Sequence, residues 1–351
     1  MKPGLKIVAY RAGLLGAFHR LRNRRRLTIA MFHRVLPRTD PRYPGADPEW
    51  TMTPDSFAAC LGFFQRHYHV LTPEQVFAAL NGQFALPSRS LLVSFDDGWA
   101  DTADQAMAVL HRFDIRALVF ITADAIGRSA PFWEEAVYDF LATVPGAQAQ
   151  LLAAWPQEST SPLTRTSADQ TRASEGQIRR LIGALNALTE QQRLALLAPL
   201  LPDHRDRPAM MNAGQLEGLV QAGHTVGGHG LQHRPVPALA DPAGDMAAAQ
   251  AQLARQLHGD AIASMSFPHG RWSRAAAAIC RAAGFRHLFT SEAGLNRLDR
   301  PLPHQKALGR IHVSERDICG ADGIVEPALL ATWMFLRPTL TQAQMEGGPH
   351  G

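Results

Sequence analysis

The sequence has 351 residues, of which 46% are hydrophobic and 19% are charged. This composition excludes a largely disordered chain, and the length suits one large globular domain or two small ones. Lysine plus arginine exceeds aspartate plus glutamate by 35 − 31 = +4, and no basic stripe interleaved with aromatic residues occurs beyond residue 26, so nucleic-acid binding is not expected. Three widely spaced cysteines without a CxxC pair argue against a disulfide framework and against a cysteine zinc site.

The first 26 residues are basic and partly apolar. Residues 5–18 are mostly apolar but include Arg11, and five arginines follow between positions 20 and 26. Because a secretory signal carries its charge before the apolar stretch, no cleavable signal peptide is expected, and the stretch is too short to span a bilayer. Two interpretations stay open: residues 1–26 form a terminal helix packed on the domain, or an amphipathic helix of residues 5–26 lies on an anionic membrane surface. The expected location is the cytoplasm or the periphery of the inner membrane.

From residue 27 onward, apolar strand patterns alternate with helical patterns. Strands are predicted at residues 27–35, 90–95, 115–122, 224–227, 263–267, 286–290 and 309–313. Helices are predicted at residues 53–67, 72–82, 102–112, 212–222, 245–257 and 273–283. Such alternation predicts a parallel sheet, either an open doubly wound sheet or a barrel.

Residues 128–209 interrupt this alternation. Helix-like stretches are separated there by a Ser/Thr-rich patch at 159–174, which predicts a helical insertion or lid rather than a separately folded domain. Trp133 and Glu134, at the start of the first stretch, either cover a substrate site or simply pack. The last residues, 338–351, include proline and glycine and are predicted to form a flexible tail.

Residues capable of acid–base or metal chemistry gather at the predicted strand ends. The carboxyl ends of parallel strands meet at one edge of a sheet, where the functional residues of α/β folds are found. Taken in chain order, these ends supply acids and imidazoles from several different loops: His33, Asp96, Asp97, His229, His233, His269 and His312. The sequence therefore predicts one functional site at this edge.

Two pairs of these residues indicate a metal-binding site. The adjacent Asp96 and Asp97 either form a turn with Gly98 or relieve their mutual repulsion with a nearby cation. His229 and His233 are four residues apart, which on a helical turn would align both imidazoles toward one metal; the alternative is two unrelated surface histidines. With a carboxylate from another strand end, the pair predicts a two-histidine, one-aspartate site for a divalent metal, with Zn²⁺ favoured.

These motifs resemble those of the polysaccharide deacetylases of the NodB-homology type, carbohydrate esterase family 4. SFDDGW at 94–99, HGLQH at 229–233 and SFPHGRW at 266–272 are similar to the first three family motifs and occur in the family's order. The resemblance covers roughly residues 27–127 and 209–313. It implies a distorted (β/α) barrel of about seven strands in a catalytic domain of residues 27–337, interrupted by the helical insertion at roughly 128–209.

The resemblance also implies residue roles. Asp96 would be the general base, and Asp97, His229 and His233 would hold the metal. The second motif has Gly230 where the family usually has Ser or Thr, so a bracing hydroxyl is absent.

The third motif departs further from the family pattern. It has Phe267 in place of the arginine that normally orients the base, so that partner must come from elsewhere. The loop of Pro268, His269 and Gly270 is expected to supply a backbone N–H to the oxyanion. His312, in a loosely matched fifth motif, is the candidate general acid, and His269 is its rival.

The expected function is metal-dependent removal of an N-acetyl group from an amino sugar of a bacterial polysaccharide, oligosaccharide or lipid-linked glycan. Metal-activated water would attack the amide, with Asp96 as the base. The alternatives are a deformylase or O-deacetylase acting on a lipid-linked sugar, and a catalytically inactive glycan-binding relative. The expected partner is an acetylated amino-sugar glycan.

Overall fold

The computed structural model describes residues 3–155, 172–201, 208–259, 262–297 and 307–337. The chain forms two compact units. The first contains Met1–Val35, Glu49–Gly127 and Met210–Gly351, and the second contains Leu36–Pro48 and Arg128–Ala209. The tail predicted at 338–351 and most of the patch at 159–174 lie outside the described residues.

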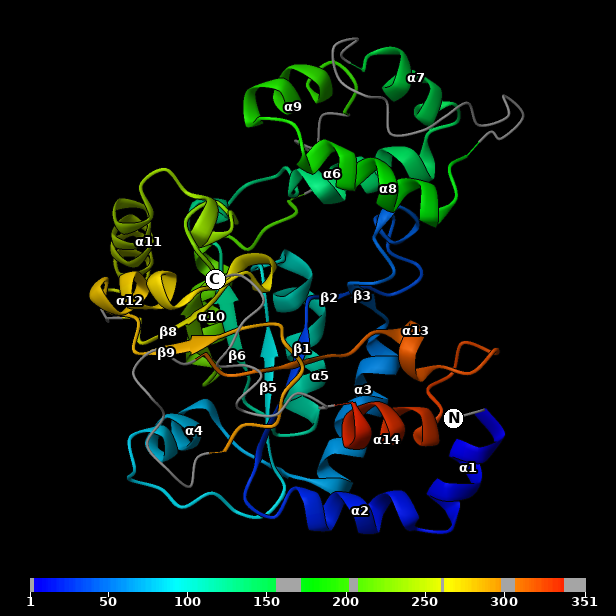
Figure 1. Ribbon diagram of the computed structural model, residues 1–351, viewed down its shortest axis with the longest axis vertical. Helices are drawn as coiled ribbons and strands as arrows, with labels where there is room; N and C mark the ends of the chain where they lie inside the picture. The colour runs from blue at the N-terminus through cyan, green and yellow to red at the C-terminus, as the bar shows by residue number, and fades with distance from the viewer. Residues whose placement is uncertain (1–2, 156–171, 202–207, 260–261, 298–306, 338–351) are drawn as a thin grey trace. The chain divides into compact units, whose positions relative to one another are not determined.

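The first unit is built around an eight-stranded parallel sheet (Figure 1). Its main path runs β10-β1-β5-β6-β7-β8-β9, and β4 pairs with β5 beside this path. The strands are β1 Leu27–Phe32, β4 His69–Val70, β5 Ser90–Phe95, β6 Leu118–Ile121, β7 Thr225–Gly228, β8 Ser264–Ser266, β9 His287–Phe289 and β10 Ile311–His312. An isolated parallel bridge from Phe289 to Leu308, three residues before β10, connects the two ends of the path. The predicted distorted barrel is therefore confirmed.

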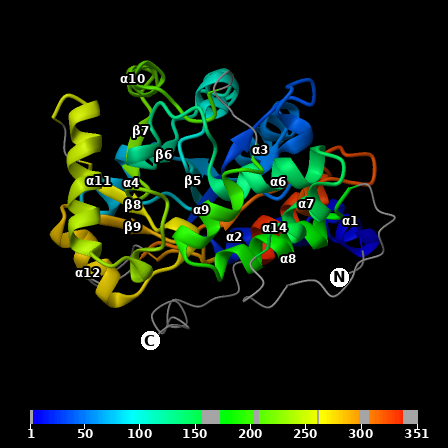
Figure 2. The same ribbon diagram turned by 90° about the horizontal axis from the view of Figure 1, so that it is seen from above.

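Helices cover the outside of the barrel close to where the sequence predicts them. They are α3 Pro54–His67, α4 Pro73–Leu80, α5 Met107–Arg112, α10 Ala213–Gln221, α11 Pro242–Gln256 and α12 Arg274–Ala282. Side chains of Thr53, Thr72, Asn212 and Ser273 accept hydrogen bonds from backbone N–H groups of the first turns, which explains the sharp helix starts. Figure 2 shows α11 and α12 on the side of the barrel formed by β8 and β9.

Two of the predicted barrel elements take a different form. The strand predicted at 27–35 breaks at His33, because β2 (Arg34–Val35) leaves the barrel to pair with β3 (Thr51–Met52). The helix predicted at 102–112 begins as a π-helical turn, Thr102–Ala106, before α5. Both irregularities lie just beyond the carboxyl ends of β1 and β5, and π turns are frequent at functional sites.

Residues 3–22 form two helices, where the sequence predicts one helix within residues 1–26. Gly13, with φ +74°, separates α1 (Pro3–Arg11) from α2 (Leu14–Arg22). The α2 helix packs on α14 (Pro327–Leu336), where the rings of His19 and Phe335 stack at 4.0 Å. The short α13 (Glu315–Ile318) precedes α14. Among the described helices, none is long and apolar enough to cross a membrane.

The second unit is helical and has its own apolar core. Its helices are α6 Trp133–Thr143, α7 Ala147–Ala153, α8 Glu175–Asn186 and α9 Glu190–Leu197. Val137, Leu141, Leu181 and Leu185 are fully buried at the centre of that core. Trp133 packs against the same core with the Arg193 guanidinium 4.5 Å from its ring centre, which supports the packing role for this tryptophan.

Candidate active site

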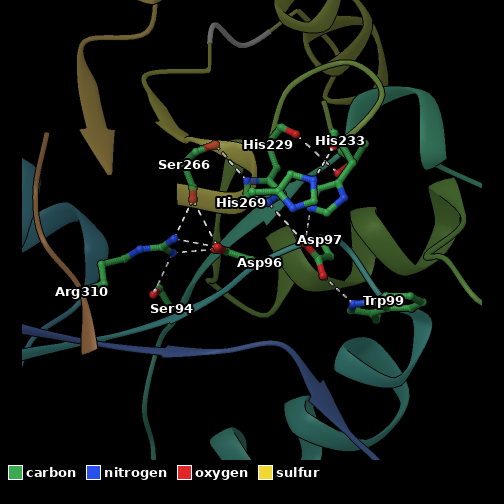
Figure 3. Close-up of polar contacts among 10 residues, drawn as sticks. Ser94, Asp96, Asp97, Trp99, His229, His233, Ser266, His269 and Arg310 are labelled. Atoms are coloured by element: carbon green, nitrogen blue, oxygen red, sulfur yellow. Dashed lines mark hydrogen bonds and ion pairs between the residues drawn. The ribbon is translucent and has the colours of Figure 1, made fainter. Parts of the chain in front are cut away.

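The structure brings the predicted strand-end residues together at the carboxyl edge of the barrel (Figure 3). Asp96 and Asp97 follow β5, and His229 follows β7. The loop Pro268–Gly270 follows β8 as a single 3-10 turn, and His312 is the last residue of β10. These residues meet because parallel pairing puts the carboxyl ends of all the strands at the same edge of the barrel.

Asp97, His229 and His233 form the potential metal site among the described residues. The Asp97 Oδ1 atom lies 3.3 Å from His229 Nε2 and 3.4 Å from His233 Nε2. Ligands held about 2.0–2.1 Å from a tetrahedral zinc ion lie roughly 3.4 Å apart, so this spacing suits a shared ion. The three groups come from two loops and are largely buried.

The surrounding contacts orient these atoms as ligands. Trp99 Nε1–H donates to Asp97 Oδ2 at 2.8 Å, and Oδ1 is buried without a hydrogen-bond partner. The Nδ1–H group of His229 donates to the Ser266 carbonyl at 2.9 Å, which directs Nε2 toward the Asp97 carboxylate. Outer contacts of this kind are typical of metal ligands. The residues present therefore fit a divalent metal, and their nitrogen and oxygen donors suit Zn²⁺.

The histidine pair does not use a helical turn. Residues 229–233 form an irregular loop in which Gly230 has φ +72° and His233 has φ +59°. A side chain at position 230 would place its Cβ 3.2 Å from the Pro268 ring, in a backbone conformation that favours glycine. The loop therefore explains why glycine stands where the resemblance suggests Ser or Thr.

The two adjacent carboxylates point in different directions because the backbone turns sharply between them. Asp97 has φ +79° and Gly98 has φ +87°. Left-handed conformations cost free energy for residues other than glycine, and they concentrate at functional sites. The turn sends Asp97 toward the histidines while Asp96 points into the barrel.

Asp96 is held by a buried arginine that sequence reasoning missed. Arg310 donates from Nη1 to Asp96 Oδ1 and from Nη2 to Asp96 Oδ2, both at 2.6 Å, and its side chain has 0% exposure. It also donates to Ser266 Oγ at 2.6 Å and to the Thr290 carbonyl at 3.1 Å. Arg310 thus replaces the orienting arginine that is absent before Pro268. The sequence signal was an arginine inside the strand predicted at 309–313.

These contacts control the ionisation of the site. Burial raises the pKa of Asp96, but the charge and hydrogen bonds of Arg310, together with His229 and His33, outweigh burial and lower it below its usual value. Burial likewise raises the pKa of Asp97, but the neighbouring histidines reverse the shift. Burial lowers the pKa of His233 to about 3, which keeps the imidazole neutral, the form that binds metals.

The loop after β8 connects two of the predicted motifs. The Nε2–H of His269 donates to the His233 carbonyl at 3.2 Å, so this ring braces the histidine loop. Pro268 has no N–H, and the Gly270 N–H closes the turn onto the Phe267 carbonyl at 2.9 Å. The other backbone N–H of this three-residue loop belongs to His269.

His312 belongs to an aromatic cluster beside the site. Its ring centre lies 4.5 Å from that of Trp50 and 5.5 Å from that of His33. Its Nδ1 is 3.9 Å from Glu49, and its Nε2 is buried without a hydrogen-bond partner. Burial, His33 and Arg337 hold the pKa of His312 well below 6.5, so its ring is neutral at pH 7.

No protein-family model and no curated protein matches this sequence. Solved structures do match. IcaB from Ammonifex degensii is 21% identical with a TM-score of 0.54, over 89% of this chain and 97% of that chain. The deacetylase PplD from Streptococcus pyogenes is 15% identical with a TM-score of 0.53, over 88% and 98%. A de-N-acetylase from Aggregatibacter actinomycetemcomitans is 16% identical with a TM-score of 0.50, over 81% and 94%. The chain therefore has the fold of the NodB-type polysaccharide deacetylases.

Proposed function

We propose that this protein is a metal-dependent hydrolase that removes the N-acetyl group from an amino sugar of a bacterial glycan. One observation carries the proposal. The two-histidine, one-aspartate group lies beside a second, buried carboxylate held ionised by Arg310, at the edge where this fold places its functional residues. The de-N-acetylase among the structural neighbours supports the same chemistry.

Asp97, His229 and His233 would hold the metal. When bound, it supplies Lewis acidity for the acyl carbonyl and lowers the pKa of water. The ionised Asp96 carboxylate accepts a proton from the attacking water, whose oxygen bonds to the acyl carbon. Arg310 keeps that carboxylate oriented through both of its oxygens.

The remaining steps use His269, which follows β8, and His312, at the end of β10. The N–H of His269 donates a hydrogen bond to the oxyanion that develops on the acyl oxygen. The carbon–nitrogen bond then breaks, and the amine nitrogen takes a proton from His312. Because His312 is neutral in the free protein at pH 7, it must first take up that proton, and its lowered pKa makes it a strong donor once charged.

The first test measures metal per chain by plasma mass spectrometry in protein purified without chelator. We expect about one zinc-like ion in the wild type and none in His229→Ala. Trp99→Phe removes the hydrogen bond to Asp97, so metal affinity should fall about 10–100-fold. Trp155→Phe is the matched control, since the Trp155 indole N–H has no hydrogen-bond partner among the described residues. Equal metal in wild type and His229→Ala would overturn the ligand assignment.

The second test measures acetate release from N-acetylated amino-sugar oligosaccharides. Asp96→Asn should abolish release while the metal content stays unchanged, because the base is lost and the ligands remain. Parallel substrates that carry formyl amides or acetyl esters identify the acyl group. Glycan binding without release of any acyl group by the metal-loaded wild type would refute the enzyme and favour a binding protein.

A further inference from the structure

Positive charge is concentrated at the beginning of the chain. Residues 1–26 contain eight basic residues and no acidic residue, which gives +8. Because the whole chain carries +4, the other 325 residues carry 27 − 31 = −4. A strongly basic segment is thus attached to a remainder that is mildly acidic overall.

The same segment exposes large apolar side chains, which we call the N-terminal face. In α2, three of them are spaced as one row along the helix, beside the row of Leu15 and His19 that is buried. The members are Leu5 (57% exposed) and Val8 (62%) on α1, and Leu14 (64%), Phe18 (45%) and Leu21 (73%) on α2. Isolated exposed apolar residues are common, but five on two consecutive helices mark an interaction surface.

Arginines line a hollow next to the N-terminal face. Its volume is about 370 Å³, and the described residues that line it are all arginine: Arg22, Arg24, Arg25, Arg26 and Arg297. Guanidinium groups bind phosphate oxygens through paired hydrogen bonds, and they do so better than ammonium groups. A hollow of this composition is suited to a phosphate-bearing group.

We propose that α1, α2 and the arginine hollow form a docking surface for an anionic phospholipid bilayer. The apolar row would enter the boundary between headgroups and acyl chains, and the arginines would bind lipid phosphates. Charge complementarity favours this partner over a symmetric pair of chains, because two copies that met through the same segment would bring +8 against +8. This proposal does not depend on the catalytic assignment.

Docking leaves the candidate active site accessible. The Asn23 carbonyl, just after α2, accepts the N–H of Arg89 at the amino end of β5, whereas Asp96 follows the carboxyl end of the same strand. Figure 1 accordingly places α1 and α2 at the end of the sheet opposite to the strand arrowheads. The two surfaces are separated by about 20 Å, the length of a six-residue strand.

Vesicle co-sedimentation tests the charged part of the surface. We expect the full chain to sediment with vesicles of phosphatidylcholine and phosphatidylglycerol, and not with phosphatidylcholine alone, at 0.1 M NaCl. Arg24→Glu with Arg25→Glu should weaken binding at least about tenfold. The control, Arg112→Glu with Arg255→Glu, changes net charge equally at exposed positions on α5 and α11 and should bind normally. If both double variants lost vesicle binding equally, net charge alone would explain the effect, and the proposal would be overturned.

The apolar part needs its own variants. Leu14→Gln with Leu21→Gln should weaken vesicle binding and remove its salt-resistant fraction at 0.5 M NaCl, where charge attraction is screened. Leu194→Gln with Ile324→Gln removes two equally exposed apolar side chains elsewhere and should have no effect. Failure of the wild type to bind anionic vesicles would refute the docking surface. Circular dichroism confirms that each variant is folded, and sedimentation velocity would reveal a dimer formed through this face instead.

Discussion

Arg310 holds the candidate base of the site in place. It is fully buried, and it is bound to Asp96, Ser266 and the Thr290 carbonyl. A buried ion pair contributes little net stability, because both charges lose their hydration. The ion pair serves here to orient the candidate base, since its two hydrogen bonds hold both oxygens of Asp96.

Replacing Arg310 should therefore affect stability and chemistry in separable ways. Arg310→Met leaves the Asp96 carboxylate buried and unpaired, which should cost about 3–5 kcal/mol of unfolding free energy and raise the pKa of Asp96. Acyl release should fall by about 10²–10⁴-fold, because Asp96 is then less ionised and no longer oriented as a base. Urea denaturation and acetate release measure the two effects.

The double variant distinguishes orientation from simple instability. Asp96→Asn combined with Arg310→Met removes both charges, so most of the lost stability should return while activity stays absent. Arg310→Lys should keep part of the activity, with the acid limb of its pH–rate profile moved to higher pH. An active Arg310→Met enzyme with an unchanged pH profile would contradict this role.

At the scale of elements, α2 depends on a neutral histidine. His19 is 1% exposed, its Nδ1 accepts from the Asn23 amide at 2.5 Å, and its Nε2–H donates to the His67 carbonyl at 3.2 Å. Burial, with the charges of Arg89, His67 and Arg20, lowers the pKa of His19 to about 4. Protonation would place a second donor against the Asn23 amide, so only the neutral ring fits.

This arrangement predicts an acid-sensitive docking of α2 on α14. The unfolded chain takes up a proton near pH 6.5, whereas the folded chain does so only near pH 4, so the contribution of His19 is intact at pH 7 and is lost as pH falls through that interval. At pH 5 the loss should be about 2 kcal/mol.

His19→Phe, which cannot titrate, is the comparison. The unfolding free energy of His19→Phe minus that of the wild type should be about 2 kcal/mol larger at pH 5 than at pH 7.5, as measured by urea denaturation. A constant difference between the two proteins at both pH values would argue against the burial of a neutral ring.

At the scale of the whole molecule, metal binding should be coupled to global stability. Asp97, His229 and His233 belong to loops after β5 and β7, so a shared ion would tie two parts of the barrel together. At a free Zn²⁺ concentration of 100 times Kd, stabilisation should be about 2.7 kcal/mol. Differential scanning calorimetry should show a higher Tm with Zn²⁺ for the wild type, and His229→Ala should show no rise.

The sequence by itself determined the features that depend on neighbours along the chain. Hydrophobic periodicity predicts the alternation of strands and helices, and the capping residue Thr53 predicts where the helix that follows it begins. The strand-end positions of Asp96, Asp97 and His229 followed as well, because parallel strands must align their carboxyl ends.

Only the tertiary structure decided the contacts between distant residues. Arg310 meets Asp96 across 214 positions because closure of the barrel places β10 beside β1. Arg22 meets the Phe335 carbonyl across 313 positions because α14 returns to the N-terminal helices. Residues 36–48 and 128–209 likewise form one compact unit although they are far apart in the sequence. Spacing along a chain encodes local geometry, whereas a partner hundreds of residues away is selected by packing, which no local pattern records.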